Sequence, residues 1–293
     1  MANWKNSSTL ALSALVLVTA VWGGTFVMVK DAVAKMPVMD FLAWRFGIAV
    51  LLMIAVRPSC LKGITRQELW RGLALGAALG LGYITQTYSL LWASASVSGF
   101  ITGLFVVLTP VMSWLILRSK VSKRVWLAVV LSTFGLGLLS LQGWFMGKGE
   151  MFTLACAVFY AIHIVGLGAW SSKYETYGFT VLQLAVLAVV SALIAVPRGI
   201  VVPPDPGVWA AVAFTAVLAS AVAFFVQTWA QALVSPSRVA VVLTMEPVFA
   251  GIFGVIIGGD LLTPRIIIGA ACVLAAMFTV QLKASALSTS AET

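Results

Sequence analysis

Charged residues are scarce in this chain of 293 residues, because Asp, Glu, Lys and Arg together make up only 9% of it. Soluble globular proteins carry about a quarter of their residues as charged side chains, so this composition falls outside their range. Hydrophobic residues, in contrast, make up 61% of the chain. The sequence therefore indicates an integral membrane protein.

Residues that bind metals or perform covalent chemistry are also few. There is one histidine, and the three cysteines are widely spaced, two of them inside apolar runs, as expected of small buried hydrophobic residues rather than disulfides. No glycine-rich element stands where it could hold a phosphate, and no nucleophile and base have a recognisable spacing. We therefore expect no metal, no cofactor and no enzymatic activity.

The net charge of +9 could suggest a nucleic-acid partner. That interpretation needs Lys and Arg gathered on a folded polar face, whereas here they fall in short loops between apolar runs. We expect the partners to be the lipid bilayer and a small-molecule substrate, and no nucleic acid. The sequence does not set the oligomeric state, for which a monomer is the simplest expectation.

Ten windows of about 20 mostly apolar residues are long enough to cross a bilayer. A small, polar segment follows them at residues 284–293, and we expect it to be a disordered cytoplasmic tail. The ten predicted spans are 10–30, 38–56, 70–92, 97–117, 125–142, 150–171, 179–196, 208–232, 237–258 and 265–283.

The connections between the spans also carry information on orientation. Most of the Lys and Arg residues fall on one side when the N-terminus is placed inside, so the positive-inside rule predicts that both termini are cytoplasmic. The expected location is the cell membrane.

A weak internal repeat divides the chain into two halves. The sequence QTYSLLW at Gln86–Trp92 resembles QTWAQAL at Gln227–Leu233, 141 positions later, and LTPV at Leu108–Val111 resembles MEPV at Met245–Val248. The halves, residues 10–142 and 150–283, each contain five spans. Because five is odd, the second half must be inverted in the membrane, as in many secondary transporters. We predict an all-α polytopic membrane protein with ten transmembrane helices, built as two inverted five-helix repeats around a central cavity.

Two formal charges and one histidine lie deep inside the predicted spans, in the hydrocarbon zone of the membrane: Arg45, Glu246 and His163. Each of the two charges sits about 12 Å along its helix, and an intramembrane charge needs a reason because its insertion costs about 2.5–3.5 kcal/mol. Arg45 could donate to carbonyls or hydroxyls of neighbouring helices. Glu246 could pair with a buried donor such as Arg45, or it could line a water-filled route. His163 could be a packing residue or a proton carrier.

Two prolines, Pro110 and Pro247, stand at matching places in the halves. Each removes a backbone N–H and frees a carbonyl one turn earlier, at Val106 and Leu243. A matched pair of kinks would let the helices open and close, so we assign both prolines to hinge or gating positions. A static kink is the alternative.

The third and eighth spans each carry a stripe of aromatic and amide side chains at helical spacing. An amide that faced lipid would be costly, so both stripes should face the protein interior. Aromatic faces combined with hydrogen-bonding groups suit a solute with an apolar body and a polar or zwitterionic end. The predicted substrate-binding residues are Trp22, Tyr83, Gln86, Tyr160, His163, Phe224, Gln227 and Glu246.

Several segments also resemble the drug/metabolite transporter superfamily, in the branch of EamA-type ten-helix transporters that includes amino acid and metabolite exporters. They are AVWGGTF at Ala20–Phe26, the pair Arg45–Phe46, MEPVFA at Met245–Ala250, GDLLTP at Gly259–Pro264 and IGAA at Ile268–Ala271. The resemblance covers nearly the whole chain. It implies export through a cavity between the halves, by alternating access.

The resemblance does not name the substrate. Small four-span relatives carry a cation-binding glutamate in the first span, and this chain has none there, which counts against export of cationic drugs. The leading hypothesis is an exporter of amino acids or similar metabolites, with aromatic or apolar ones favoured. A carrier of drugs or nucleotide precursors and a passive channel are the alternatives. Proton coupling through Glu246 or His163 and facilitated diffusion both stay open.

Overall fold

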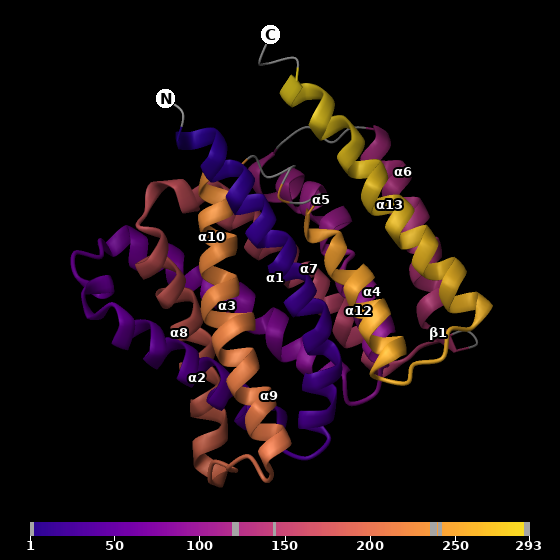
Figure 1. The fold of residues 1–293 in the computed structure, drawn as a ribbon. Coiled ribbons are helices and arrows are strands. Elements are labelled where there is room, and N and C mark those ends of the chain that lie inside the picture. The colour runs from indigo at the N-terminus through magenta and orange to yellow at the C-terminus, as the bar shows by residue number, and fades with distance from the viewer. Residues whose placement is uncertain (1–2, 119–122, 143–144, 235–238, 240–241, 290–293) are drawn as a thin grey trace.

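A computed structural model describes residues 3–118, 123–142, 145–234, 239 and 242–289. Nearly all of these residues are helical. Apart from the connecting turns and loops, the described residues also form a hairpin of two-residue strands, β1 (Leu141–Gln142) and β2 (Phe145–Met146), which pair antiparallel between the two halves of the chain. Figure 1 shows the helices running roughly alongside one another, with the start of α1 and the end of α13 at the same end of the molecule.

The first half runs from α1 to α6 and the second from α7 to α13. Short 3₁₀ turns follow α2, α7 and α8, at Pro58–Leu61, Ser171–Lys173 and Val196–Arg198. The longer elements of the first half are α1 (Asn3–Val33), α2 (Val38–Val56), α3 (Arg66–Ser89), α4 (Ala95–Thr102), α5 (Phe105–Leu117) and α6 (Lys123–Ser140). Those of the second half are α7 (Lys148–Trp170), α8 (Thr176–Ala195), α9 (Pro206–Ala216), the π-helical segment η4 (Val217–Val222), α10 (Ala223–Leu233), α12 (Met245–Ile256) and α13 (Pro264–Thr289).

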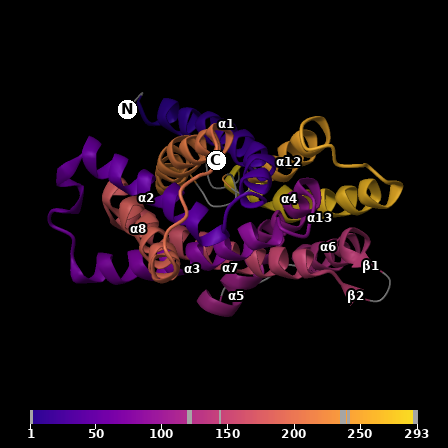
Figure 2. The ribbon, with the colours of Figure 1, turned by 90° about the horizontal axis from the view of Figure 1, so that it is seen from below.

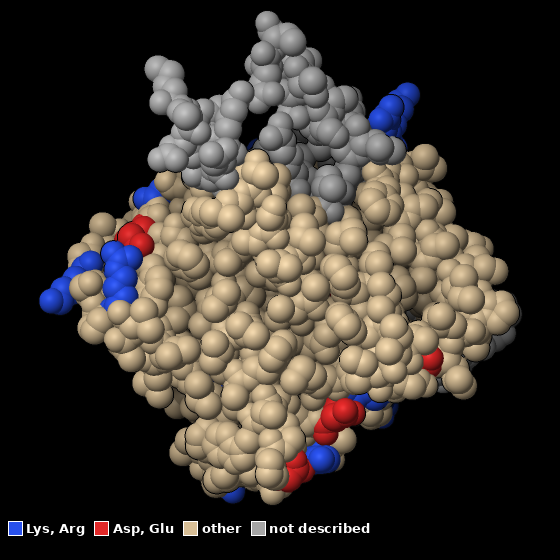
Figure 3. Space-filling view, viewed as in Figure 1, with Lys and Arg blue, Asp and Glu red and all other residues tan. Residues whose placement is uncertain are grey.

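The predicted spans coincide with these helices. In the described part of the chain, six helical stretches are long and apolar enough to cross a membrane, and three shorter apolar helices accompany them. Figure 3 shows a broad uncharged band across the molecule, with charged side chains gathered near its margins. This pattern matches a polytopic protein whose middle faces lipid.

Two of the predicted spans that the structure describes in full are interrupted in ways that the sequence did not indicate. The fourth consists of α4 and α5, which meet at Gly103 and Leu104. At this junction the hydrogen bonds from Leu104 N to Ile101 O and from Val106 N to Gly103 O span three residues, as in a 3₁₀ turn, instead of four. The eighth contains the π-helical segment η4 between α9 and α10. The predicted ninth span includes positions 237, 238, 240 and 241, which lie outside the described residues.

Neither interruption coincides with a predicted proline kink. Pro110 is the sixth residue of α5, and Pro247 is the third residue of α12. A proline in the first turn of a helix removes an N–H that has no partner within that helix anyway. Pro247 is therefore compatible with the start of α12, and the hinge role of both prolines stays a prediction.

The C-terminal helix also differs from expectation. α13 continues to Thr289, so residues 284–289, which we predicted as part of a disordered tail, are helical. Ala and Leu in this stretch are strong helix formers, and they extend a helix whose first turns are already formed.

Helix contacts repeat between the halves. Two pairs unite an element of the first half with the corresponding element of the second, namely α2 with α8 and α6 with α13, and α4 packs against α12, the counterpart of α5. The contact of α3 with α7 is matched by that of α10 with α1. Figure 2 shows α6 and α13 at one end of the molecule and α2 and α8 toward the other. The chain is thus two five-helix repeats that pack around a shared interior.

Candidate functional site

A cavity lies between the two halves. It is lined from both of them, by side chains of α1, α3, α5, α7, α10 and α12 together with Leu243. All eight predicted substrate-binding residues line it: Trp22, Tyr83, Gln86, Tyr160, His163, Phe224, Gln227 and Glu246.

An aromatic cluster forms much of the cavity wall. The Phe224 ring lies 5.4 Å from that of Trp22 and 5.8 Å from that of Tyr83, and the Tyr160 ring lies 5.6 Å from that of Tyr83. Tilted and edge-on arrangements at such distances are the favourable ones for aromatic pairs. Tyr83 and Phe224 hold equivalent places in the repeat, so the two stripes meet across the cavity as the sequence predicted.

Arg45 lies behind this wall rather than in the cavity lining. Its side chain is 2% exposed, its Nε donates to Ser220 Oγ at 2.9 Å, and its Nη2 lies 3.3 Å from Tyr83 Oη and 3.4 Å from the carbonyl oxygen of Ala219. The guanidinium carbon also lies 4.7 Å from the centre of the Tyr83 ring, which adds a cation–π contact. Arg45 therefore donates to a carbonyl and hydroxyls of neighbouring helices, one of the roles anticipated for it.

The π-helical segment η4 supplies the acceptors for this arginine. Backbone N–H groups of a π-helix bond to the carbonyl five residues earlier, and such segments often stand at functional sites. The Ala219 carbonyl in η4 accepts from Trp22 Nε1 at 2.9 Å as well as from Arg45. The segment thus connects α1 and α2 of the first half to the helix that carries Phe224 and Gln227.

The two cavity amides, which hold equivalent places in the halves, differ in their bonding. Gln86 Oε1 accepts from the Tyr160 hydroxyl at 3.2 Å, and Gln86 Nε2 lies 3.4 Å from Thr102 Oγ1. Gln227 Oε1 is buried and finds no donor among the residues that the structure describes, and the same holds for Gln231 Oε1 one turn later.

His163 is held by a residue that the sequence analysis missed. Its Nε2 lies 2.8 Å from Gln183 Oε1, and Gln183 Nε2 donates to the carbonyl of Phe179 at 2.9 Å. The second bond fixes the amide orientation, so His163 Nε2 must carry a hydrogen and only Nδ1 can exchange a proton. The signal that could have identified Gln183 is that it is a lone amide in the predicted span 179–196.

Glu246 is buried in the first turn of α12, with 6% of its surface exposed. The positive end of the helix dipole lies there and favours a negative charge. Within the described part of the chain, its carboxylate makes no hydrogen bond or ion pair. The predicted alternative of a pair with Arg45 is therefore not what this structure shows.

Helices α4 and α12 pack directly against each other at one end of the cavity. A Cβ atom added to Gly99 would overlap the Cβ of Ala250, and one added to Gly103 would lie 2.9 Å from Pro247 Cγ. Small residues let helices approach this closely. At the same end, the Asp260 carboxylate accepts a hydrogen bond from Ser96 N at 2.7 Å, across the two halves.

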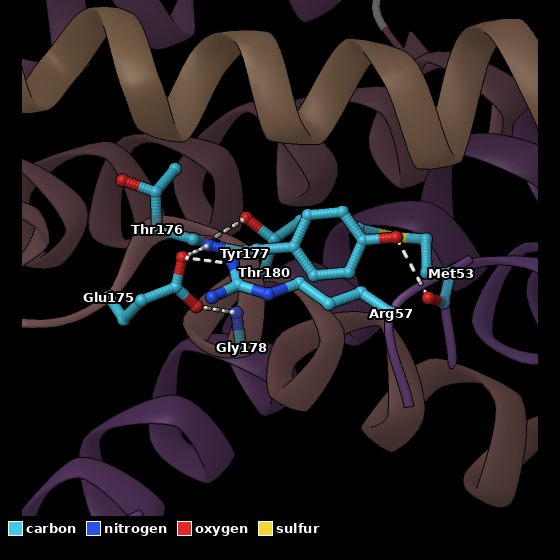
Figure 4. A network of polar contacts seen from close by, with 7 residues as sticks. All are labelled: Met53, Arg57, Glu175, Thr176, Tyr177, Gly178 and Thr180. Atoms are coloured by element: carbon cyan, nitrogen blue, oxygen red, sulfur yellow. Dashed lines mark hydrogen bonds and ion pairs between the residues drawn. The ribbon is translucent and has the colours of Figure 1, made fainter. Parts of the chain in front are cut away.

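Helices α2 and α8 are linked at both ends. At one end, Arg57 Nη1 lies 2.9 Å from Glu175 Oε1 and the Tyr177 hydroxyl donates to the carbonyl of Met53 at 2.8 Å (Figure 4). At the other end, the buried Asp40 carboxylate forms an ion pair with Arg198 and accepts from Val201 N at 2.8 Å. Ion pairs therefore join the two halves at both ends of the α2–α8 helix pair.

The fold and the cavity together are typical of polytopic membrane transporters. Comparison with known proteins gives the same class. The EamA-like transporter family matches residues 9–141 and again residues 147–282. The chain belongs to this family. It is similar to an uncharacterized transporter of Archaeoglobus fulgidus, with 33% identity over 269 residues that cover 92% of this chain and 85% of the relative.

Two further comparisons agree, the first with another transporter and the second for the fold alone. The chain is similar to the uncharacterized transporter YyaM of Bacillus subtilis, with 26% identity over 276 residues that cover 88% of each protein. It shares its fold with a crystal structure of a protein at 18% identity, with a TM-score of 0.67 and coverage of 96% of this chain and 99% of the other. The resemblance noted in the sequence is thus confirmed for the family.

Proposed function

We propose that this protein is a secondary transporter of the cell membrane that exports small metabolites by alternating access, with aromatic or apolar amino acids favoured. The observation that carries the proposal is the cavity between the halves, which combines an aromatic wall with amide, hydroxyl and carboxylate groups. An amino acid with an apolar side chain has the same combination, because its body is apolar and its other end is zwitterionic.

The contact of α4 with α12 supports alternating access. It closes one end of the interface between the halves through small residues, and small residues allow a contact to be tight without large side chains interlocking. In a carrier of this kind the closed end opens in the alternate state, so that a solute in the cavity reaches each side in turn.

Both termini are proposed to be cytoplasmic. The start of α1 and the end of α13 lie at the same end of the molecule (Figure 1), which requires an even number of crossings. The excess of basic residues predicted for the loops at this end agrees with the positive-inside rule.

Flux into liposomes tests the transport proposal. The purified chain is reconstituted, its folding is checked by thermal unfolding, and counterflow of labelled phenylalanine, leucine and other amino acids is measured. We expect saturable counterflow of the aromatic or apolar members. Absence of flux for the whole amino acid panel, from folded protein, would contradict the proposal.

A cross-link tests the mechanism. Lys35, in the turn after α1, and Asp205, before α9, form an ion pair across the halves, with Nζ and Oδ2 2.9 Å apart. In a background without native cysteines, Lys35→Cys with Asp205→Cys joined by a short bifunctional thiol reagent should stop counterflow. The single Lys35→Cys variant treated with the same reagent is the control. Undiminished flux after complete cross-linking would support a channel instead.

A further inference from the structure

The cavity contains a hydrogen-bond acceptor without a donor, whereas the equivalent acceptor in the other half has one. Gln86 and Gln227 both line the cavity, 141 positions apart in the chain. The Tyr160 hydroxyl donates to Gln86 Oε1, whereas Gln227 Oε1 has no donor among the described residues although Gln227 is only 3% exposed. A buried carbonyl oxygen without a donor is costly, so a ligand donor is its natural partner.

A second open acceptor lines the same cavity. The Glu246 carboxylate is buried at the start of α12 and makes no hydrogen bond or ion pair with any residue that the structure describes. Arg45 does not neutralise it, because its donors go to Ser220, Tyr83 and the Ala219 carbonyl. Both open acceptors, Gln227 and Glu246, thus belong to the second half of the chain.

These acceptors define the chemistry of the missing partner. A primary ammonium group has three N–H donors and no acceptor, and its positive charge compensates a carboxylate. The rings of Trp22 and Phe224, 5.4 Å apart in the same cavity, offer further favourable contacts to a cation and to an apolar body. A ligand whose only polar group is a carboxylate would instead place its negative charge beside the Gln227 Oε1 acceptor and the Glu246 carboxylate.

We infer that the cavity recognises the ammonium group of its substrate through Gln227 Oε1 and the Glu246 carboxylate, so that its ligands are primary amines, α-amino acids among them. The inference rests on the proposed function in taking this cavity as the transport site. It goes further in stating which end of the substrate is selected and which residues select it.

The opposite side of the cavity is suited to the carboxylate of an amino acid. The Tyr83 hydroxyl belongs to the first half and lies 3.3 Å from Arg45 Nη2, so a guanidinium charge stands directly behind a group that lines the cavity. An anion near this hydroxyl is favoured by that charge. An α-amino acid would therefore span the two halves, with its ammonium group toward α10 and α12.

Three compounds of one shape test the inference by calorimetric titration of the purified full chain. Phenylalanine has both charged groups, 2-phenylethylamine has only the ammonium, and 3-phenylpropionate has only the carboxylate. We expect the first two to bind at least about tenfold more tightly than 3-phenylpropionate, since hydrogen bonds to charged groups are the strong ones. Equal affinity for phenylalanine and 3-phenylpropionate, or no binding of any of the three, would overturn the inference.

Matched variants identify the recognising residues. Glu246→Gln and Gln227→Leu should each reduce the affinity ratio of phenylalanine to 3-phenylpropionate by about tenfold or more. Gln231→Leu changes a buried amide of the same helix that does not line the cavity, and it should keep the wild-type ratio. A ratio within one variant does not depend on the fraction of active protein. Unchanged ratios in both Glu246→Gln and Gln227→Leu would refute the assignment.

Flux separates this inference from the proposed function. Selective binding of 2-phenylethylamine and phenylalanine without counterflow of any amino acid would support ammonium recognition and contradict amino acid export. Counterflow of phenylalanine that 3-phenylpropionate inhibits as strongly as 2-phenylethylamine does would support export and contradict ammonium recognition.

Discussion

Asp40 in the first turn of α2 and Glu175 at the start of α8 form equivalent links between the two halves. Asp40 binds Arg198, which follows α8, and Glu175 binds Arg57, which follows α2. Each acidic residue also accepts backbone N–H bonds, Asp40 from Val201 and Glu175 from Tyr177 and Gly178. The pair α2–α8 is therefore held at both of its ends in this conformation.

The Asp40 link should contribute more to stability than the exposed ion pair of Lys35 with Asp205, because Asp40 is fully buried. Asp40→Asn should lower the free energy of unfolding by about 1.5–3 kcal/mol, the usual range for a hydrogen-bonded charged group. Lys35→Ala breaks an ion pair whose side chains are 53% and 36% exposed, and it should cost less than about 1 kcal/mol. Thermal unfolding in detergent gives both values. A loss with Lys35→Ala as large as with Asp40→Asn would contradict this ranking.

Glu175 should make stability depend on pH. Partial burial raises the pKa of this carboxyl, but the N–H groups of Gly178 and Tyr177 and the Arg57 guanidinium outweigh that effect and hold it below its usual value. A depressed pKa means that the ionised form is favoured in the folded state, so its stabilising contribution is present above the unfolded value of about 4.3 and is lost as the pH falls through the folded value.

The expected signature of Glu175 is a melting temperature that decreases on acidification below about pH 4.5. Glu175→Gln should reduce that decrease. Glu175→Ala should also remove the N-cap of α8, at a cost of about 1 kcal/mol near neutral pH. Identical acid profiles for the wild type and Glu175→Gln would show that other carboxyls control the transition.

The stability of the contact between Gly99 and Ala250 should depend on the summed volume of the two side chains. Gly99→Ala overpacks the α4–α12 interface, and the expected destabilisation is about 1–3 kcal/mol, with altered counterflow because this end no longer closes as in the wild type. Adding Ala250→Gly returns the lost space and should restore both properties. Thermal unfolding and counterflow of the single and double variants provide the measurement. Failure of the double variant to recover either property would show that the contact is not the cause.

Arg45 should not tolerate replacement by lysine. Its planar guanidinium reaches Ser220, Tyr83 and the Ala219 carbonyl while it stacks on the Tyr83 ring, and a single ammonium cannot reproduce that geometry. Arg45→Lys should lower stability by about 1.5–3 kcal/mol and weaken substrate binding. Ser220→Ala removes only one of these acceptors and should cost less. Wild-type stability in Arg45→Lys would mean that charge alone suffices at this position.

The sequence was sufficient to predict the spans, the family and the composition of the cavity, for one physical reason. A polar side chain in an apolar span has to face the protein interior, so Tyr83, Gln86, Phe224 and Gln227 could be assigned to inward stripes from their spacing alone. Glu246 could be assigned to the interior in the same way. The roles of these residues in transport stay predictions.

Other features depended on tertiary contacts that no local pattern encodes. The interruption at Gly103 and Leu104 lies well before Pro110, where the sequence predicted a kink, and no local pattern at these two residues distinguishes it from a continuous helix. The ion pairs of Asp40 and Glu175 join residues more than 100 positions apart, near helix ends that hydropathy does not align. The bonding of Gln227 became visible only by comparison with Gln86 in the folded protein.

The π-helical segment η4 constrains the number of residues between α9 and α10. A π-helical segment accommodates roughly one extra residue in an α-helix, and each residue turns an α-helix by about 100°. Deleting a single residue from Val217–Val222 would therefore rotate α10 relative to α9 and carry Gln227 away from the cavity, although every cavity side chain would still be present. The number of residues in this segment thus sets which face of α10 the substrate meets.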